Sequence, residues 1–393
     1  MSEARIDRIT NENNTAGPII SGITTFSGQN FFVPPKGTTA QRPSNCPPGS
    51  IRFNTDSAKL EYFDNLQWLE LEAFNVEIGI STNAAGTSGG LGNRGVFGGG
   101  TFYPATYYNV IEYVTISTTG NAIDFGDLTV ARSWYSAALS SSTRGIWAGN
   151  QTTSSPYAPD NRIDYVTISS TGNAQDFGDL ITNVSSAVTS GASSSTRGLI
   201  AGGDTNGLGA NTNVIQYITM DSTGNSVDFG DLAVTRYALS CLASSTRGVF
   251  GGFGPAYSNS IEFVTISTLG NAADFGDLLG GSGNGSGASN ATRGLFTIGI
   301  RSPAATNIIE FITIASTGNA TDFGDTTQAR FYGSSVSSST RGLHAGGANG
   351  GAGNDINIID YVTILTTGNA IDFGDLSAAK RGGAACSNGH GGL

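Results

Sequence analysis

The chain has 393 residues, of which 57 are glycine and only 12% are charged. Its 30 acidic and 19 basic residues give a formal net charge of −11, which disfavours a protein that tracks nucleic-acid phosphates with a dense basic face. No apolar run approaches the roughly 18 residues of a membrane span, and three cysteines with two histidines are too few for a Cys/His zinc site.

The N-terminal part is expected to contain two short segments. Residues 1–45 have no hydrophobic period and predict an extended arm that begins without the apolar core of a secretion signal. Residues 46–80 are expected to form a small attachment module. Within them, 50–54, 59–63 and 66–71 alternate between apolar and polar residues and are separated by turn-forming residues, which predicts a three-stranded β-meander.

Residues 81–393 are built from an internal repeat. The string Thr-Gly-Asn-x-x-Asp-Phe-Gly-Asp occurs six times, at spacings of 52, 52, 46, 48 and 50 residues between its first glycines. Each unit contains four short runs of β-branched and aromatic residues, separated by Gly, Ser and Asn. Four strands in a unit of about 50 residues, repeated around a ring, are typical of a β-propeller. The sequence therefore predicts an all-β chain whose main part is a six-bladed β-propeller with four-stranded blades.

The two ends of the repeat region predict how the ring closes. The first Arg-Gly strand, at Arg94, has no complete strand of the Ala-Arg…Ala-Ala-Leu type before it. The segment 380–388 aligns with such a strand, the one at 132–141. We therefore expect the C-terminal strand to complete the blade formed by 94–128, which removes an open sheet edge.

The repeat resembles the kelch type. It has an Arg at the start of the first strand, a Gly-Gly doublet after the second, a Tyr in the third and an aromatic fourth strand, although Asp-Phe-Gly-Asp-Leu stands where that family usually has Trp. The resemblance covers about residues 94–393.

Two further segments resemble proteins of tailed bacteriophages. The stretch Pro-Gly-Ser-Ile-Arg-Phe-Asn-Thr-Asp-Ser-Ala-Lys-Leu-Glu-Tyr-Phe-Asp-Asn-Leu-Gln-Trp, residues 48–68, is similar to a module of tail fibres and other appendage proteins. The Phe-Gly-Asp-Leu repeats with Ser-Ser-Thr-Arg-Gly resemble structural proteins of marine phages, especially cyanophages. These resemblances imply a virion protein that is assembled in the host cytoplasm and binds other virion proteins through its N-terminal region, with a homotrimer as one possible assembly.

Charged residues recur with the repeat and predict structural ion pairs. Six arginines open the second strand of each unit: Arg94, Arg144, Arg197, Arg247, Arg293 and Arg341. The first aspartates of the Asp-Phe-Gly-Asp motifs are Asp124, Asp176, Asp228, Asp274, Asp322 and Asp372. Six equivalent copies favour a structural role over catalysis, which needs one site with two unlike carboxylates; calcium binding is the other alternative.

A second acidic position lies within the apolar third strand and needs a partner. Its members are Glu112, Asp164, Glu262, Glu310 and Asp360, with Gln216 in the remaining repeat. The sequence leaves open which acid each repeat arginine takes. His344 stands three residues after Arg341, where other repeats carry Phe, Trp or Ile, which predicts a core position rather than a catalytic one.

Ligand specificity is expected where the copies differ, because loops on a rigid scaffold usually carry binding residues. Exposed aromatic residues beside Asn, Ser and Gly are typical of paratope-like or sugar-binding surfaces; the alternative is that they fill the centre or pack between blades. The candidates in the variable segments are Tyr103, Tyr107, Tyr108, Trp134, Tyr135, Tyr157, Tyr237, Tyr257, Phe331 and Tyr332.

The resulting hypothesis is an adhesion protein of a phage virion, with the propeller displayed for binding a glycan or protein of the host surface. The alternatives are a capsid or tail decoration protein, a glycan-cleaving enzyme and a cellular kelch-type adaptor. We expect no catalytic residues, metal, cofactor, nucleic-acid partner or membrane insertion.

Overall fold

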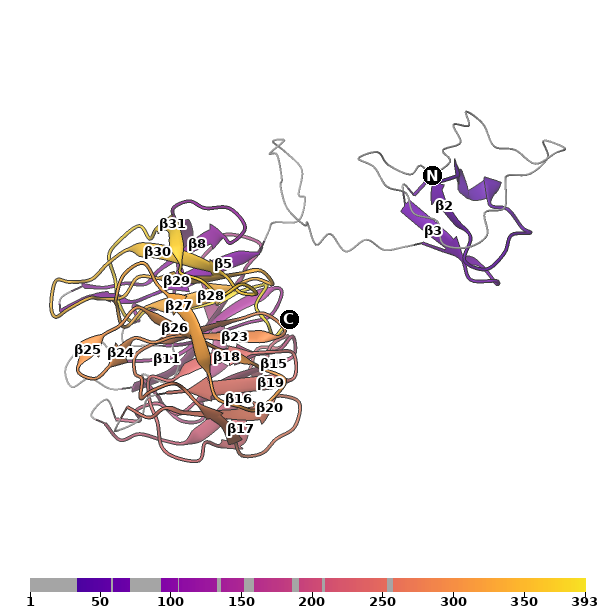
Figure 1. Ribbon diagram of the computed structural model, residues 1–393. Coiled ribbons are helices and arrows are strands. Elements are labelled where there is room, and N and C mark those ends of the chain that lie inside the picture. Colours follow the sequence, from indigo (N-terminus) through magenta and orange to yellow (C-terminus); the bar gives the residue numbers. More distant parts are fainter. Residues whose placement is uncertain are drawn as a thin grey trace, which may run out of the picture. The chain divides into compact units, whose positions relative to one another are not determined.

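The structure is a computed structural model (Figure 1) that describes residues 34–57, 59–70, 93–104, 106–132, 136–151, 159–185, 191–206, 209–252 and 257–393. The chain divides into two compact units, 1–76 and 77–393. The secondary structure of the described residues is β throughout, apart from one 3-10 turn, η1 (Thr39–Gln41). None of the described segments forms a helix long and apolar enough to cross a membrane.

The first unit contains one four-stranded sheet, ordered β1 (Lys36–Gly37), β2 (Ile51–Asn54), β3 (Lys59–Phe63) and β4 (Trp68–Glu70). The antiparallel β2–β3–β4 part confirms the predicted meander. The short parallel β1 was not expected, because 1–45 was predicted to be an extended arm. Backbone bonds from Phe53 to Pro35 and from Thr55 to Gly37 attach this segment to β2.

The buried face of this small sheet is polar. Glu61 is fully buried and its carboxylate lies 2.6 Å from the Arg42 guanidinium and 3.4 Å from that of Arg52. Ile51 and Leu60, on the opposite face, are 54% and 40% exposed. A buried carboxylate needs such partners, so the arginines hold the loop at 42 against the sheet.

Within the described part of the second unit, six four-stranded antiparallel sheets follow the repeat, and we call them repeat sheets one to six. Sheet one contains β32 (Ala384–Ser387), β5 (Arg94–Gly98), β8 (Val110–Thr115) and β9 (Ile123–Asp127). Sheet two contains β10 (Ala137–Ser140), β11 (Arg144–Gln151), β12 (Pro159–Thr167) and β13 (Gln175–Asp179). Sheet three contains β14 (Ala192–Ser193), β15 (Arg197–Ala201), β16 (Val214–Thr219) and β17 (Val227–Asp231).

The remaining sheets have the same order. Sheet four contains β18 (Ser240–Ala243), β19 (Arg247–Gly251), β20 (Ser260–Thr265) and β21 (Ala273–Asp277). Sheet five contains β22 (Ser286–Ser289), β23 (Arg293–Thr297), β26 (Ile308–Thr313) and β27 (Thr321–Asp325). Sheet six contains β28 (Ser334–Ser337), β29 (Arg341–Ala345), β30 (Ile358–Thr363) and β31 (Ile371–Asp375). Two small hairpins, β6 (Thr101–Phe102) with β7 (Thr106–Tyr107) and β24 (Ile300–Arg301) with β25 (Ala304–Ala305), extend from sheets one and five.

The first strands of the six sheets contact one another in cyclic order. β10 contacts β14, and β14 contacts β18; β22 and β28 follow, and β32 contacts both β28 and β10. The C-terminal β32 pairs with β5, with Ala384 opposite Gly98 and Ser387 opposite Gly95. The prediction that the last strand of the chain completes the first sheet is therefore confirmed.

Serine hydroxyls link the first strands of sheets five, six, one and two. Ser337 Oγ donates to the carbonyl of Ser289, Ser387 Oγ to that of Ser337, and Ser140 Oγ to that of Ser387. The same hydroxyls accept backbone N–H groups of the preceding sheet, as Ser387 Oγ does from Ser337. Each small side chain thus satisfies two buried backbone groups, which explains the Ser-rich first strands.

The Thr-Gly-Asn-x-x-Asp-Phe-Gly-Asp motif joins neighbouring sheets at their outer strands. The N–H of Gly172 donates to the carbonyl of Phe125, and Asn173 Oδ1 accepts the N–H of Asp127. Equivalent bonds join every neighbouring pair, including Gly120 to Phe373 and Asn121 to Asp375 across the ends of the chain. The motif is therefore a clasp between sheets.

The glycine of Phe-Gly-Asp is required by this clasp. Gly126 lies at a bulge with φ of +146°, and a Cβ there would stand 2.4 Å from the carbonyl oxygen of Gly172. Both the backbone conformation and the close approach of the next turn exclude a side chain.

Candidate functional site

The predicted pairs between repeat arginines and motif aspartates do not form. Arg197 Nη1 donates to the carbonyl of Ile266 in the next sheet, and its guanidinium stacks 4.8 Å from the Tyr217 ring. All six repeat arginines share this arrangement, with carbonyl acceptors at Ile168, Met220, Ile266, Ile314, Ile364 and Ile116. The six first aspartates of the motifs are exposed. Each arginine stacks on the aromatic ring of the third strand because that ring lies next to the arginine in the same sheet.

The acids of the third strand are paired, but with different cations. Asp164 lies 2.8 Å from the Arg132 guanidinium, Glu262 lies 2.5 Å from that of Arg236, and Arg330 contacts Asp360. Each cation stands five residues after the last aspartate of the preceding Asp-Phe-Gly-Asp motif. It therefore lies on the connection that arrives from the neighbouring sheet. The second carboxylate oxygen of Glu262 also accepts the N–H of Ala233 on the same connection.

The two repeats that lack this cation show how the charge is balanced. Repeat three has Val184 at the cation position, and its acid is replaced by Gln216, which bonds the N–H and carbonyl of Thr182. Repeat five has Ser282 there but keeps Glu310, which pairs with Arg301 from the β24–β25 hairpin. Burial raises the pKa of Glu310. A buried charge in this position is thus always paired or absent, as its desolvation requires.

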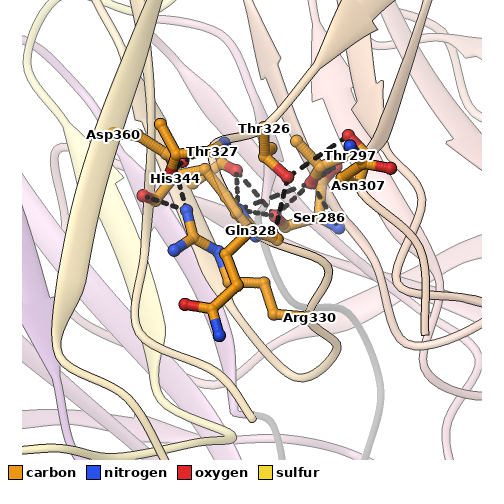
Figure 2. A network of polar contacts seen from close by, with 10 residues as sticks. Ser286, Thr297, Asn307, Thr326, Thr327, Gln328, Arg330, His344 and Asp360 are labelled. Carbon is orange, nitrogen blue, oxygen red and sulfur yellow. Dashed lines mark hydrogen bonds and ion pairs between the residues drawn. The ribbon is translucent and has the colours of Figure 1, made fainter. Parts of the chain in front are cut away.

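His344 lies in a buried polar network between sheets five and six (Figure 2). Its Nδ1 is 3.0 Å from Ser286 Oγ and 3.1 Å from Ser335 Oγ, and its carbonyl accepts a bond from Arg330. Burial, followed by the nearby Arg330 charge, holds the pKa of His344 well below its usual value. The predicted core position is confirmed, and a neutral, buried imidazole that fills a Phe, Trp or Ile position has a structural role.

Five of the candidate aromatic residues meet at one end of the repeat sheets, and we call them the aromatic cluster: Tyr103, Tyr237, Tyr257, Phe331 and Tyr332. Tyr237, Tyr257 and Tyr332 pack around Ala238, and the ring of Tyr332 stands edge-on to that of Phe331 at 4.8 Å. Tyr103 follows β6, and Tyr257 lies in the loop between β19 and β20. The other three lie on the connections before sheets four and six. Only the fold brings them together.

Arg381 and Asp355 fix one side of the aromatic cluster. The Arg381 guanidinium lies 5.2 Å from the Tyr103 ring and 5.9 Å from that of Phe331. Its Nε contacts Asp355, and its Nη2 donates to the carbonyl of Gly351 at 2.7 Å. The other Asp355 oxygen accepts the N–H of Tyr103 at 2.7 Å, so this carboxylate positions the tyrosine.

The hydroxyls of Tyr237 and Tyr332 stay protonated at neutral pH. Burial raises the pKa of Tyr332, and the neighbouring Tyr237, Tyr257 and Tyr103 act in the same direction against Arg381. Burial also raises the pKa of Tyr237, with smaller contributions from Tyr257 and Asp204. These groups offer hydroxyls that can donate and accept hydrogen bonds.

Two residues of the aromatic cluster have a left-handed backbone conformation. Tyr257 has φ of +51° and Tyr332 has φ of +64°, in the left-handed region that bulky side chains rarely adopt. Gly382 occupies the position equivalent to Tyr332 at the end of repeat six, with φ of +67°. The equivalent residues Ala238 and Asn284 have φ of +50° and +57°, so the left-handed conformation at Tyr332 is a feature of the repeat.

The aromatic cluster and the C-terminus lie at opposite ends of the repeat sheets. Arg381 precedes β32 and the tail 388–393 follows it, so the strand runs from one end to the other; Figure 1 shows the C-terminus far from the β24–β25 hairpin. At the tail end, His390 Nε2 lies 3.1 Å from the carbonyl of Ser140, and the N–H of Gly391 donates to Ser289. The tail therefore contacts the first strands of sheets two and five.

The other candidates have separate positions. Tyr107 lies half-buried in β7, and the backbone of Tyr108 bonds Gly100 and Arg132. Trp134, Tyr135 and Tyr157 lie outside the described residues. Sequence reasoning missed Arg381 as a member of the site. The sequence does single out this position, because Arg381 stands where the equivalent positions of the other repeats carry Ser, Tyr, Gly or Phe.

Among the residues that the structure describes, no group of three or more His, Cys, Asp or Glu side chains is placed to hold a metal ion. In comparisons with known proteins, no family model and no curated protein matched the chain.

Proposed function

We propose that the six repeat sheets are the blades of a six-bladed β-propeller with β32 as the innermost strand of the first blade. The cyclic contacts of the first strands, the clasp repeated between all neighbouring outer strands and the pairing of β32 with β5 support this architecture. A closed ring of this kind leaves no open edge at the junction of the two chain ends.

We further propose that this propeller is a recognition module of a bacteriophage particle and acts by binding rather than catalysis. The observation that carries the proposal is the aromatic cluster, which gathers Tyr103, Tyr237, Tyr257, Phe331 and Tyr332 at one end of an otherwise repetitive frame. Six similar copies need only structural constraints. A cluster of side chains that breaks the repeat is where selection for a ligand would act.

The N-terminal unit would attach the chain to the particle, as the resemblance of residues 48–68 to phage appendage modules suggests. The host surface, through a glycan or a protein, would be the partner of the propeller. This arrangement separates attachment and recognition between the two compact units of the chain.

A second candidate function, decoration of the particle, is favoured by a different observation. Large apolar side chains on the fourth-strand side of several repeats are exposed: Ile123, Ile181, Val227, Leu269, Leu279, Leu365 and Ile371, each more than half. Exposed apolar groups of this kind can pack against neighbouring subunits. In that role the propeller would stabilise the particle surface.

Two measurements on phage particles that carry the chain test these roles. A density map of the whole particle shows whether the aromatic cluster faces outward. Excess purified full-length chain, added to host cells before the phage, is expected to reduce adsorption if the propeller recognises the host. A cluster buried against other virion proteins, together with unchanged adsorption, would contradict recognition and support decoration.

A further inference from the structure

The cation beside the aromatic cluster is already paired. Arg381, the cation beside it, is paired with Asp355 and also bonded to the carbonyl of Gly351. Asp204, near Tyr237, accepts the backbone N–H groups of Asn206 and Gly209. In the described surroundings of the cluster, a ligand would therefore meet aromatic rings and no cation that is available to pair with it.

The charge of the whole chain points the same way. A formal net charge of −11 repels polyanions such as acidic or sulfated polysaccharides, and the summed field of a protein acts well beyond direct contacts. Arg381 does not offset this at the site, because it already shares its charge with Asp355.

The geometry offers flat apolar faces next to hydroxyl groups. The rings of Tyr103 and Phe331 lie 5.2 Å and 5.9 Å from the Arg381 guanidinium, and Tyr103 is 37% exposed. Aromatic side chains combine a large apolar surface with a polar tip in this way. The pyranose ring of a neutral sugar has the matching character, with C–H groups on one face and hydroxyls at its rim.

We propose that the aromatic cluster binds a neutral hexose residue of an oligosaccharide, with its C–H face against the Tyr103 side of the cluster. This inference rests on the proposed recognition role and specifies its ligand class. Phosphorylated, sulfated and uronic acid sugars are excluded by the absence of an available cation in the described part of the site.

Two substitutions test the site without removing the core. Tyr332→Gly places at a strained position the residue that the chain itself has at Gly382, so this variant is expected to fold. Tyr103→Ala removes an exposed ring. Leu365→Ala, at a 60% exposed position in the turn after β30, is the matched control. Thermal melting of all three variants verifies that they fold.

The experiment measures binding of full-length chain to glucose, mannose and galactose tetrasaccharides and to trigalacturonate by calorimetry. We expect binding of at least one neutral probe, weakened about tenfold or more by Tyr332→Gly and by Tyr103→Ala, since each lost contact of about 1.4 kcal/mol corresponds to tenfold in Kd. Leu365→Ala should bind like the wild type. Binding only of trigalacturonate, or neutral binding that neither tyrosine variant changes, would overturn the inference.

The adsorption experiment separates the inference from the function on which it rests. If no saccharide binds but full-length chain still reduces phage adsorption, the ligand class is wrong and the recognition role stands. If the chain neither binds a saccharide nor competes for adsorption, both are wrong.

Discussion

Lys380 Nζ lies 2.6 Å from Glu112 Oε1, and the two buried side chains are 268 positions apart in the sequence. The other carboxylate oxygen accepts the N–H of Ser377 at 2.7 Å. This contact joins the last connection of the chain to the third strand of the first repeat sheet. Sheets six and one are therefore joined by the same kind of ion pair that joins sheets one and two, three and four, and five and six.

Removal of residues 384–393 is expected to lower the melting temperature markedly and to cause aggregation. The deletion takes away β32 and exposes the edge of β5, which offers unpaired backbone groups to other chains. Thermal melting and light scattering measure both effects. Removal of 389–393 alone keeps every strand pair and should have a smaller effect. Equal melting of the 384–393 deletion and the full chain would rule out a structural role for β32.

Arg236→Val is expected to destabilise the protein by roughly 3–5 kcal/mol, because it leaves the Glu262 carboxylate buried without its cation. Arg236→Val combined with Glu262→Gln reproduces the Val184 and Gln216 combination of repeat three and should recover most of this loss. Urea unfolding of the two variants and of Glu262→Gln completes a double-mutant cycle. Additive effects of the two substitutions would show that the pair is not coupled.

Arg197→Ala is expected to cost about 1–2 kcal/mol, the value of one hydrogen bond to a carbonyl and one cation–π contact. This is less than a buried ion pair would cost. Asp228→Asn, which changes an exposed aspartate of the repeat motif, should stay within about 0.5 kcal/mol of wild type. A loss of stability in Asp228→Asn as large as that in Arg197→Ala would restore the original pairing hypothesis.

Gly276→Ala is expected to destabilise more than Gly270→Ala. The two glycines have similar φ, +144° and +150°, so the conformational strain of an added side chain is comparable. Only at Gly276 would a Cβ meet the backbone, 2.5 Å from the carbonyl oxygen of Gly318; nothing lies within 4 Å at Gly270. The difference in unfolding free energy between the two variants gives the contribution of the close backbone approach at the clasp. Equal losses would mean that the close approach is not needed.

Stability is expected to fall as the pH drops from 7.5 to 5.5. Burial lowers the pKa of His390 to about 4, and burial with the Arg330 charge lowers that of His344 well below its usual value. Histidines in the unfolded chain titrate at about pH 6.5, so below that pH the unfolded state binds more protons than the folded state. Falling pH therefore favours the unfolded state and lowers the free energy of unfolding. Urea unfolding across this range measures the slope. His344→Phe should reduce it, and an unchanged slope would exclude His344 as a contributor.

The repeat frame could be predicted from the sequence because its signals are local and occur in many copies. Strand runs, turn residues and the period all follow from one unit, and the unmatched segment at 380–388 indicates how the first sheet is completed. The ion pairs were assigned to the wrong arginines because sequence spacing does not show which side chain crosses between sheets. The replacement of acid by Gln216 in the one repeat with Val184 was the available signal, since it links the two positions directly.

The aromatic cluster could be predicted only as a set of candidates. Which of them meet depends on the left-handed backbone at Tyr257 and Tyr332 and on the contact of Arg381 with the rings of Tyr103 and Phe331. These features arise from loops of different sheets that are up to 278 residues apart, as between Tyr103 and Arg381. Local patterns carry no information about such contacts.

Competition for host adsorption tests the central claim most directly, with wild-type chain compared with the variant carrying both Tyr103→Ala and Tyr332→Gly. Both proteins are added in excess to host cells before phage particles that carry the chain, after melting curves have established that both are folded. The account predicts that the wild type reduces adsorption and that the double variant does not. Equal reduction by the two proteins would contradict recognition through the aromatic cluster.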